Sequence, residues 1–213
     1  MFEASLRQSI FVSANRGERF PMKSMNGSRK ARTNSNSRNT TLQRLYAEDL
    51  RDIYWAEKHL LKALPKMARA ADSAKLKAAF QHHLAQTEEH VARVVDVFSA
   101  SGIKPSTKKC EGIEGLTKEG EEVIQDHEAG SVRDAGLIMA AQKVEHYEIS
   151  AYGSLRNLAR TMGLEKAAEL LQATLDEEAD ADKRLSTLSD TVNERAFTES
   201  ESIKDRAANA LIM

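Results

Sequence analysis

The segment Val144-Glu145-His146-Tyr147-Glu148-Ile149 decides how the chain folds, because it places two acids within an apolar helical stripe. Glu145 and Glu148 are three residues apart, so in a helix of about 3.6 residues per turn they share one face. Burying two carboxylates on an apolar face costs several kcal/mol unless a metal ion or a basic partner compensates their charge. The apolar residues that share this face recur at helical spacing: Ile138, Ala141, Ile149, Tyr152 and Leu155.

The composition of the whole chain is that of a helical protein. Its 213 residues are 41% hydrophobic and 30% charged, with only three prolines and ten glycines, which predicts one globular domain. No apolar run approaches the roughly 20 residues that span a bilayer, so a soluble protein without a membrane partner is expected. The single cysteine, Cys110, cannot form an internal disulfide, which favours a reducing compartment and predicts a cytoplasmic location.

Residues 1–40 are predicted to be a disordered basic leader. They hold eight Lys and Arg residues against two Glu, a balance of +6, whereas the remainder holds 23 basic and 30 acidic residues, a balance of -7. Ser, Asn, Arg and Gly dominate the second half of this leader. A basic arm of this kind can bind nucleic acid. We favour a solvated tail or an untranslated segment, because Met22 and Met25 are alternative starts, and nucleic acid is not an expected partner.

Residues 41–193 are predicted to form an up-down antiparallel four-helix bundle, so the fold class is all-α. The expected helices cover 41–72, 73–100, 131–162 and 164–192, with an additional short helix over 113–127 in the middle connection. Gly102 and Gly163 are expected to end the second and third long helices. Pro65 predicts a kink or a local break in the first. Residues 194–213 are predicted to be a C-terminal tail, either a frayed helix or an arm.

The acids in these helices fit the template of a carboxylate-bridged dimetal bundle. Such bundles use one Glu from each of two helices and a Glu-x-x-His pair from each of the other two. Thr87 and Ala181 depart from this template, since they stand where a glutamate and a histidine are expected. The site is predicted to hold two iron ions, with manganese as the other candidate. The candidate metal ligands are Glu57, His90, Glu145, Glu148 and Glu178, with Gln86 and Asp182 beside the two mismatched positions.

The alternative to a metal is a buried network in which the acids pair with basic side chains. Arg51, Arg156 and the histidines are the candidate partners. Tyr147 and Tyr152 are expected to be packing residues. Three further histidines are predicted to lie at the surface or at the edge of the core, outside the site: His82, His83 and His146.

Five blocks of the sequence carry a family resemblance: 50–65, 83–90, 110–122, 140–149 and 170–178. The most specific is Ala140-Ala-Gln-Lys-Val-Glu-His-Tyr-Glu-Ile149. From Leu42 to about Asn193 the sequence resembles the YciE/YciF family of ferritin-like bacterial stress proteins. The resemblance implies a rubrerythrin-like fold, a dimetal site and a homodimer. It also implies metal ligation by Glu57, Glu145, Glu148 and Glu178, and the family often has a glutamate where this chain has Gln86.

Three functions follow as hypotheses. The first is a ferritin-like stress-response protein that handles iron, oxygen or peroxide, with ferroxidase or peroxidase activity left open. The second is a non-enzymatic dimeric scaffold whose buried acids form ion pairs. The third is protection of nucleic acid through the basic leader.

Overall fold

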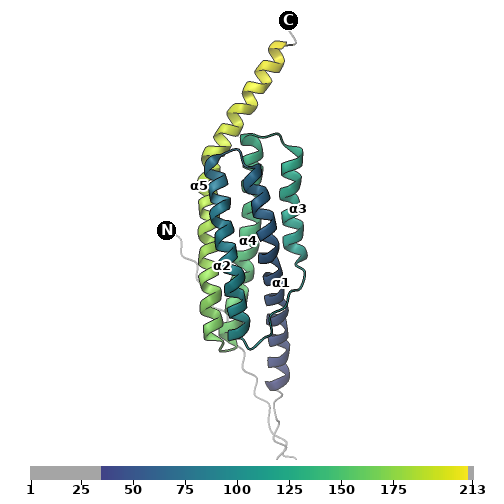
Figure 1. Ribbon diagram of the computed structural model, residues 1–213, viewed down its shortest axis with the longest axis vertical. Coiled ribbons are helices and arrows are strands. Elements are labelled where there is room, and N and C mark those ends of the chain that lie inside the picture. Colours follow the sequence, from purple (N-terminus) through teal and green to yellow (C-terminus); the bar gives the residue numbers. More distant parts are fainter. Residues whose placement is uncertain (1–34, 211–213) are drawn as a thin grey trace, which may run out of the picture. The chain divides into compact units, whose positions relative to one another are not determined.

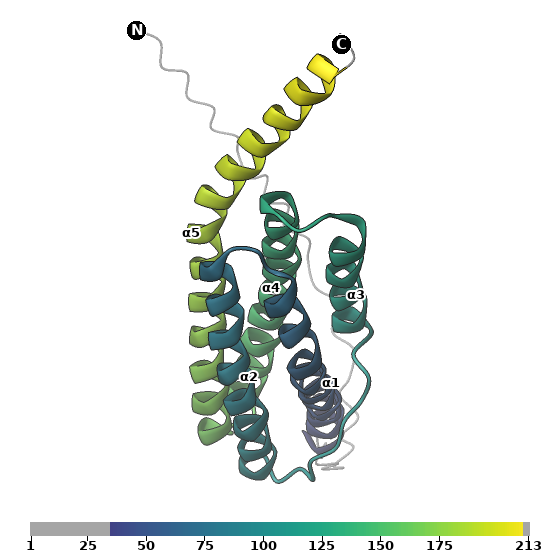
Figure 2. The same ribbon diagram turned by 45° about the horizontal axis from the view of Figure 1, so that its top comes forward.

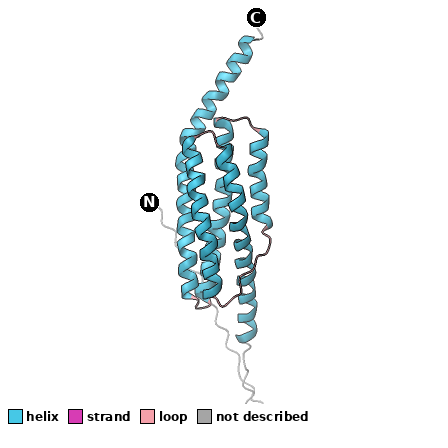
Figure 3. Ribbon diagram, viewed as in Figure 1, coloured by secondary structure: helices cyan, strands magenta, loops and turns pink. Residues whose placement is uncertain are grey.

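The computed structural model describes residues 35–210, and within that range the chain forms helices and no strand (Figures 1 and 3). This confirms the predicted all-α fold. The predicted leader, apart from its last residues, lies outside the described range. The helices in chain order are α1 (Ser35–Ala70), α2 (Ala74–Ala100), α3 (Glu111–Asp126), α4 (Ser131–Thr161) and α5 (Glu165–Ala210).

Four of the helices form a bundle in which each packs against two neighbours. α1 contacts α2 and α4, and α5 contacts the same two helices. Short turns at 71–73 and 162–164 make α1–α2 and α4–α5 antiparallel pairs. The additional helix, α3, contacts α1 and α4 on one flank (Figure 2). α3 carries the chain from the end of α2 back to the opposite end of the bundle, so that α4 runs in the same direction as α2 (Figure 1).

Two helices extend beyond their predicted ranges. α1 begins at Ser35, inside the predicted leader, and continues without a break through Pro65. α5 continues to Ala210 instead of ending near residue 192. Residues 193–210 contain no Gly or Pro, and good helix formers maintain the helix after the apolar stripe stops. Glu199 links this part of α5 to α4. Its carboxylate accepts hydrogen bonds from the hydroxyl of Ser131 at 2.9 Å and from the backbone N–H of Ser131 at 3.1 Å.

The turns between helices follow local rules that the sequence contains. Gly102 and Gly163 adopt φ values of 67° and 74° just after α2 and α4 end, a left-handed conformation that favours glycine. Both predicted helix ends are confirmed. The Asp134 carboxylate, on the first turn of α4, accepts hydrogen bonds from the backbone N–H groups of Asp72 and Ser73 at 2.8 and 2.7 Å. The α1–α2 turn is thereby held against α4.

The buried face of α2 is rotated from the apolar stripe that the sequence predicts. Leu84 and Val91 are only half-buried, whereas His83, Thr87 and His90 are buried. The prediction that His83 lies at the surface or the edge of the core is therefore wrong. The apolar pattern misplaced the centre of this face because its central positions are polar and point at acids from the other helices.

The middle of every bundle helix carries buried polar residues between apolar layers. Along α1, Glu57 lies between Ile53 and Leu60, all three at most 3% exposed. The same order recurs on α5, where Glu178 lies between Leu171 and Leu185. One polar layer thus crosses an otherwise apolar core. None of the helices in the described range has the length and hydropathy of a membrane-spanning segment.

Candidate metal centre

Six titratable side chains from all four bundle helices meet in this polar layer. None of them is more than 6% exposed. Each comes from the middle of its helix, where the apolar layers on both sides exclude water. They are Glu57 from α1, His83 and His90 from α2, Glu145 and Glu148 from α4, and Glu178 from α5.

The six residues divide into two groups that share one carboxylate. The first, called the His83 group, contains His83, Glu145, Glu148 and Glu178. The second, called the His90 group, contains Glu57, His90 and Glu178. In each group every residue offers one ligand atom, and these atoms all lie within 4.8 Å of one another. Two neighbouring cations bridged by Glu178 would use every carboxylate of the layer.

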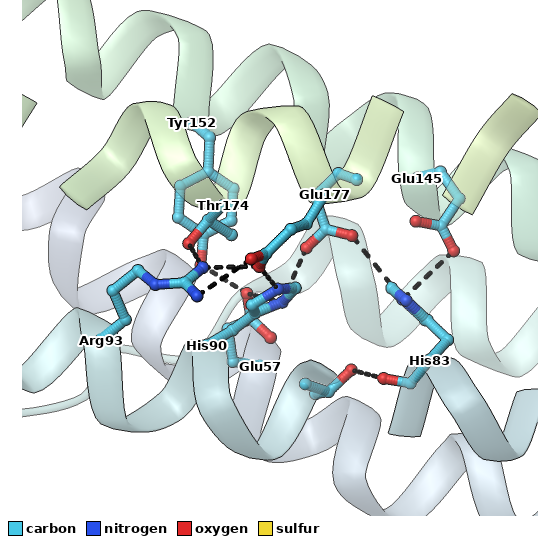
Figure 4. A network of polar contacts seen from close by, with 10 residues as sticks. Glu57, His83, His90, Arg93, Glu145, Tyr152, Thr174 and Glu177 are labelled. Carbon is cyan, nitrogen blue, oxygen red and sulfur yellow. Dashed lines mark hydrogen bonds and ion pairs between the residues drawn. The ribbon is translucent and has the colours of Figure 1, made fainter. Parts of the chain in front are cut away.

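The histidine nitrogens face the carboxylates across short distances (Figure 4). His83 Nε2 lies 3.3 Å from Glu145 Oε1 and 3.7 Å from Glu178 Oε2. His90 Nδ1 lies 3.0 Å from Glu178 Oε1 and 3.6 Å from Glu57 Oε1. None of these four approaches has the geometry of a hydrogen bond. The nitrogens and oxygens converge on common points, as the ligands of a cation do.

Most polar atoms of the layer have no hydrogen-bond partner among the residues that the structure describes. The clearest case is Glu148, which is fully buried and has both carboxylate oxygens unpartnered. Leaving such atoms unpaired in a low-dielectric interior is strongly unfavourable. The other unpartnered atoms are Glu57 Oε2, both nitrogens of His83, His90 Nδ1, Glu145 Oε2 and both oxygens of Glu178.

The electrostatics of the layer reflect an excess of carboxylates. Burial, and then the neighbouring Glu178, raise the pKa values of Glu145 and Glu148 well above the ordinary value. Burial lowers the pKa of His83, which therefore favours the neutral imidazole with a free lone pair. Burial also opposes the charged form of His90, but Glu178 and Glu57 outweigh it and raise the pKa of His90 to about 11.

A chain of hydrogen bonds behind His90 fixes the orientation of its ring (Figure 4). His90 Nε2 lies 2.8 Å from Glu177 Oε2, and Arg93 donates hydrogen bonds to both oxygens of Glu177 at 2.6 and 3.1 Å. Arg93 also donates to the Thr174 hydroxyl at 2.8 Å. Since a carboxylate only accepts, Nε2 is protonated, and Nδ1 is turned toward Glu57 and Glu178. Metal-binding histidines are commonly oriented by such a carboxylate.

Tyr152 packs in the core and also contacts one of these six side chains. Its side chain is fully buried, and its hydroxyl donates a short hydrogen bond to Glu57 Oε1. Burial raises its pKa well above the ordinary value, so the phenol keeps its proton. Tyr147 lies outside the layer, and its hydroxyl contacts Cys110 Sγ and Asp52 Oδ2, both at 3.0 Å.

Two predicted ligands do not belong to either group. Asp182 Oδ1 lies 3.0 Å from Gln142 Nε2 and 3.3 Å from Nε2 of the exposed His146, and its carboxylate is absent from both groups. Gln86 is half-buried and lies beside His83 at a cavity of about 20 Å³ between α2 and α5. Ala181 lines the same cavity, so the histidine that the template expects there is replaced by open space.

The predicted arginine partners of the acids are engaged elsewhere, so that version of the ion-pair hypothesis is wrong. Arg51 Nε donates to the Ser106 hydroxyl at 2.9 Å. Arg156 Nη1 donates to Gln172 Oε1 at 2.6 Å. The prediction of surface positions for His82 and His146 is confirmed, since both are exposed. Of the partners that the ion-pair hypothesis names, only the histidines lie near the acids, and Glu148 still has no hydrogen bond.

His83 is the residue of the layer that sequence reasoning missed. It lies seven residues before His90, two helical turns along the same face, with Thr87 between them. The 4-and-3 spacing of these three residues is the signal that identifies the polar face. Leu84 obscures this signal, because an apolar stripe through Leu84 fits the helical spacing equally well.

Comparison with known proteins identifies close relatives. Residues 41–197 match the family model described as a domain of unknown function, DUF892. The protein YciF of Escherichia coli is 46% identical over 158 residues, which cover 73% of this chain and 95% of YciF.

Solved structures agree with this likeness. The crystal structure of the E. coli stress protein YciF matches with a TM-score of 0.70 at 44% identity, covering 72% of this chain and 98% of that one. YcfI of Rhodopseudomonas palustris matches with a TM-score of 0.67 at 37% identity, covering 76% and 98%. A Xanthomonas campestris protein, 20% identical with a TM-score of 0.60, shares the fold.

Proposed function

The chain belongs to the DUF892 family, and on that premise we propose that it is a stress-response protein with a carboxylate-bridged dimetal centre. The His83 group and the His90 group would each hold one ion, and Glu178 would bridge them. The stress role extends to this chain what is said of its E. coli relative. We also propose that the protein is a cytoplasmic homodimer. The family resemblance supports the dimer, and the single cysteine supports the cytoplasmic location.

One observation carries the metal proposal: the fully buried Glu148 carboxylate has no hydrogen-bond partner on either oxygen. A scaffold protein has no use for such a group, because replacing buried charges with apolar residues is often neutral or stabilising. A cation between Glu148, Glu145 and His83 would convert this unfavourable arrangement into a set of ligands.

The ligand types favour iron or manganese over the other common metals. Four carboxylates and two imidazoles supply oxygen and nitrogen donors and no thiolate. Carboxylates suit manganese and imidazoles suit iron, whereas a structural zinc site more often uses thiolates in a closed tetrahedron. Bound iron would supply one-electron steps at each ion, the chemistry that dioxygen or peroxide requires.

The protein side chains would hold and protect this centre in distinct ways. Glu177, held by hydrogen bonds from Arg93, orients His90 so that its Nδ1 would be available to a bound ion. Tyr152 holds its proton against Glu57 Oε1 and fixes that carboxylate. The small side chain of Ala181 leaves space beside His83 and Glu145, through which a small reactant would approach from the α2–α5 side.

Iron loading followed by oxidation tests the proposed function. Metal-free protein would be titrated anaerobically with Fe(II), freed of unbound iron, and mixed with dioxygen or hydrogen peroxide. We expect about two ions per chain and oxidation faster than that of free Fe(II). The Asp182→Asn variant is a matched control, since Asp182 is an acid of α5 outside both groups, and it should behave like the wild type. Fewer than about one ion per two chains would rule out a dimetal centre.

Metal-free protein is expected to lose stability as pH rises from about 4.5, the ordinary pKa of a glutamate, toward about 11, the raised pKa of His90. The pKa values of Glu145 and Glu148 are raised by burial and then by Glu178, so the folded state binds more protons than the unfolded state. The raised pKa of His90, about 11, acts in the same direction above its ordinary value. Each such group stabilises the fold below its unfolded pKa, and this contribution disappears as pH rises through the folded pKa.

Thermal unfolding of metal-free protein across this pH range measures the effect. Metal-loaded protein serves as the comparison, because binding requires deprotonated ligands and should weaken or reverse the slope. A melting temperature of metal-free protein that climbs with pH would show that these carboxylates are stabilised in their charged form.

A further inference from the structure

The additional helix α3 closes a second cavity on the other side of the His83 group. This cavity lies between α1, α3 and α4 and has a volume of about 20 Å³. Leu60 and Val144 are among its apolar walls, and His83 and Glu145 form the wall shared with the polar layer. Every lining residue is buried except Leu116 of α3, which is half-buried. Figure 2 shows α3 beside α1 and α4, where it covers this flank.

The size and lining of the cavity suit a small apolar guest. A volume of about 20 Å³ accommodates one molecule of the size of water or dioxygen. A trapped water needs polar partners, but the Thr117 hydroxyl already donates to Ile113 O at 2.8 Å and lies 3.0 Å from His59 Nε2. His83 and Glu145 are the remaining polar residues of the lining, but nearly all of the cavity surface is apolar. Apolar cavities of this kind stay dry and bind apolar guests.

We propose that this cavity binds dioxygen and places it beside the ion of the His83 group. The binding itself depends only on the apolar walls, whereas the use of the bound dioxygen rests on the proposed dimetal function. In this proposal α3 has a role beyond the packing of Ile113 into the core, because it covers the flank of the polar layer and completes a binding site there.

Gly120 offers a substitution that fills the cavity without disturbing the fold. It is a buried residue of α3 and lines the cavity. A Cβ added there would lie 3.6 Å from Ala140 Cβ and 4.0 Å from Met67 Cε, which are ordinary packing distances. Gly115 lies one and a half turns earlier on the same helix, is exposed, and has no neighbour within 4 Å of an added Cβ. Gly115→Ala is therefore a matched control for helix propensity.

The test uses dissolved dioxygen as a paramagnetic probe of metal-free, methyl-labelled full-length protein. Relaxation of the Leu60 and Val144 methyls should be enhanced at least about threefold over that of Leu155 and Leu171, which are fully buried outside this cavity. Gly120→Ala should remove most of this excess, and Gly115→Ala should preserve it. Equal enhancement at all four residues, or an excess that survives Gly120→Ala, would overturn the proposal.

A second measurement separates this inference from the proposed function. In iron-loaded protein, Gly120→Ala should slow oxidation by dioxygen several-fold relative to Gly115→Ala and leave the iron content unchanged. If wild-type protein binds no iron while the methyl relaxation behaves as expected, the proposed function fails and the cavity site stands. If iron binds and is oxidised equally fast in both variants, the cavity does not supply the dioxygen that reacts.

Discussion

Glu178→Gln is expected to release both metal ions, lowering the bound metal from about two ions per chain to almost none. Glu178 belongs to both the His83 group and the His90 group, so a neutral amide in its place weakens both positions at once. Altering a residue that only supports a ligand already costs about 10- to 100-fold in affinity, and a bridging ligand should cost more. Metal analysis after dialysis against a weak chelator measures the loss.

Two further variants make this result specific. Glu57→Gln removes a carboxylate from the His90 group alone and should leave the ion of the His83 group bound. Asp182→Asn, one turn after Glu178 on α5, should retain both ions because its carboxylate contacts Gln142 and His146 instead. If Glu178→Gln binds as much metal as the wild type, Glu178 does not bridge the ions.

Glu148→Gln is expected to have opposite effects on the metal-free and metal-loaded forms. In metal-free protein both Glu148 oxygens are buried without partners, and its raised pKa reports a charged form that the fold disfavours. Each unit by which the folded pKa exceeds the unfolded one corresponds to about 1.4 kcal/mol at high pH. An uncharged amide of similar shape should therefore stabilise the metal-free fold by about 1–3 kcal/mol at pH 8.

The same substitution should abolish most of the stabilisation that added iron or manganese confers, because the His83 group loses a carboxylate. Thermal unfolding of the wild type and of Glu148→Gln, each with and without metal, gives the four melting temperatures to compare. Glu169→Gln, an exposed acid on α5, controls for a change of charge at the surface. Destabilisation of metal-free Glu148→Gln would instead mean that a buried cation depends on this carboxylate, since removing one partner of a buried pair costs about 3–5 kcal/mol.

Much of the fold was predictable because helix ends and apolar spacing are local properties. Gly102 and Gly163 mark two helix ends, and the apolar repeats identify the bundle helices. The end of α5 was not predictable from the apolar stripe, because residues 193–210 remain helical through their own propensity and through Glu199, which contacts Ser131 from a distant part of the chain. Sequence spacing carries no information about such a contact.

The carboxylates of the candidate site were easier to predict than its histidines. Glu57, Glu145, Glu148 and Glu178 interrupt apolar stripes, and the structure brings all four into one buried layer. The sequence pattern places His83 at the edge of the core because its apolar neighbour Leu84 fits the same stripe, and only packing fixes the rotation of α2. Asp182 is a candidate by sequence only because it lies beside Ala181, but a shift of one residue turns a helical side chain by about 100°, here toward the surface.

Anomalous scattering from crystals of iron-loaded protein, recorded at the iron absorption edge, tests the dimetal centre most directly. The account predicts two peaks in the polar layer, one within ligand distance of His83 and one within ligand distance of His90, with Glu178 contacting both. Crystals of folded, iron-soaked protein without a peak in this layer, or with iron only at surface acids, would contradict it.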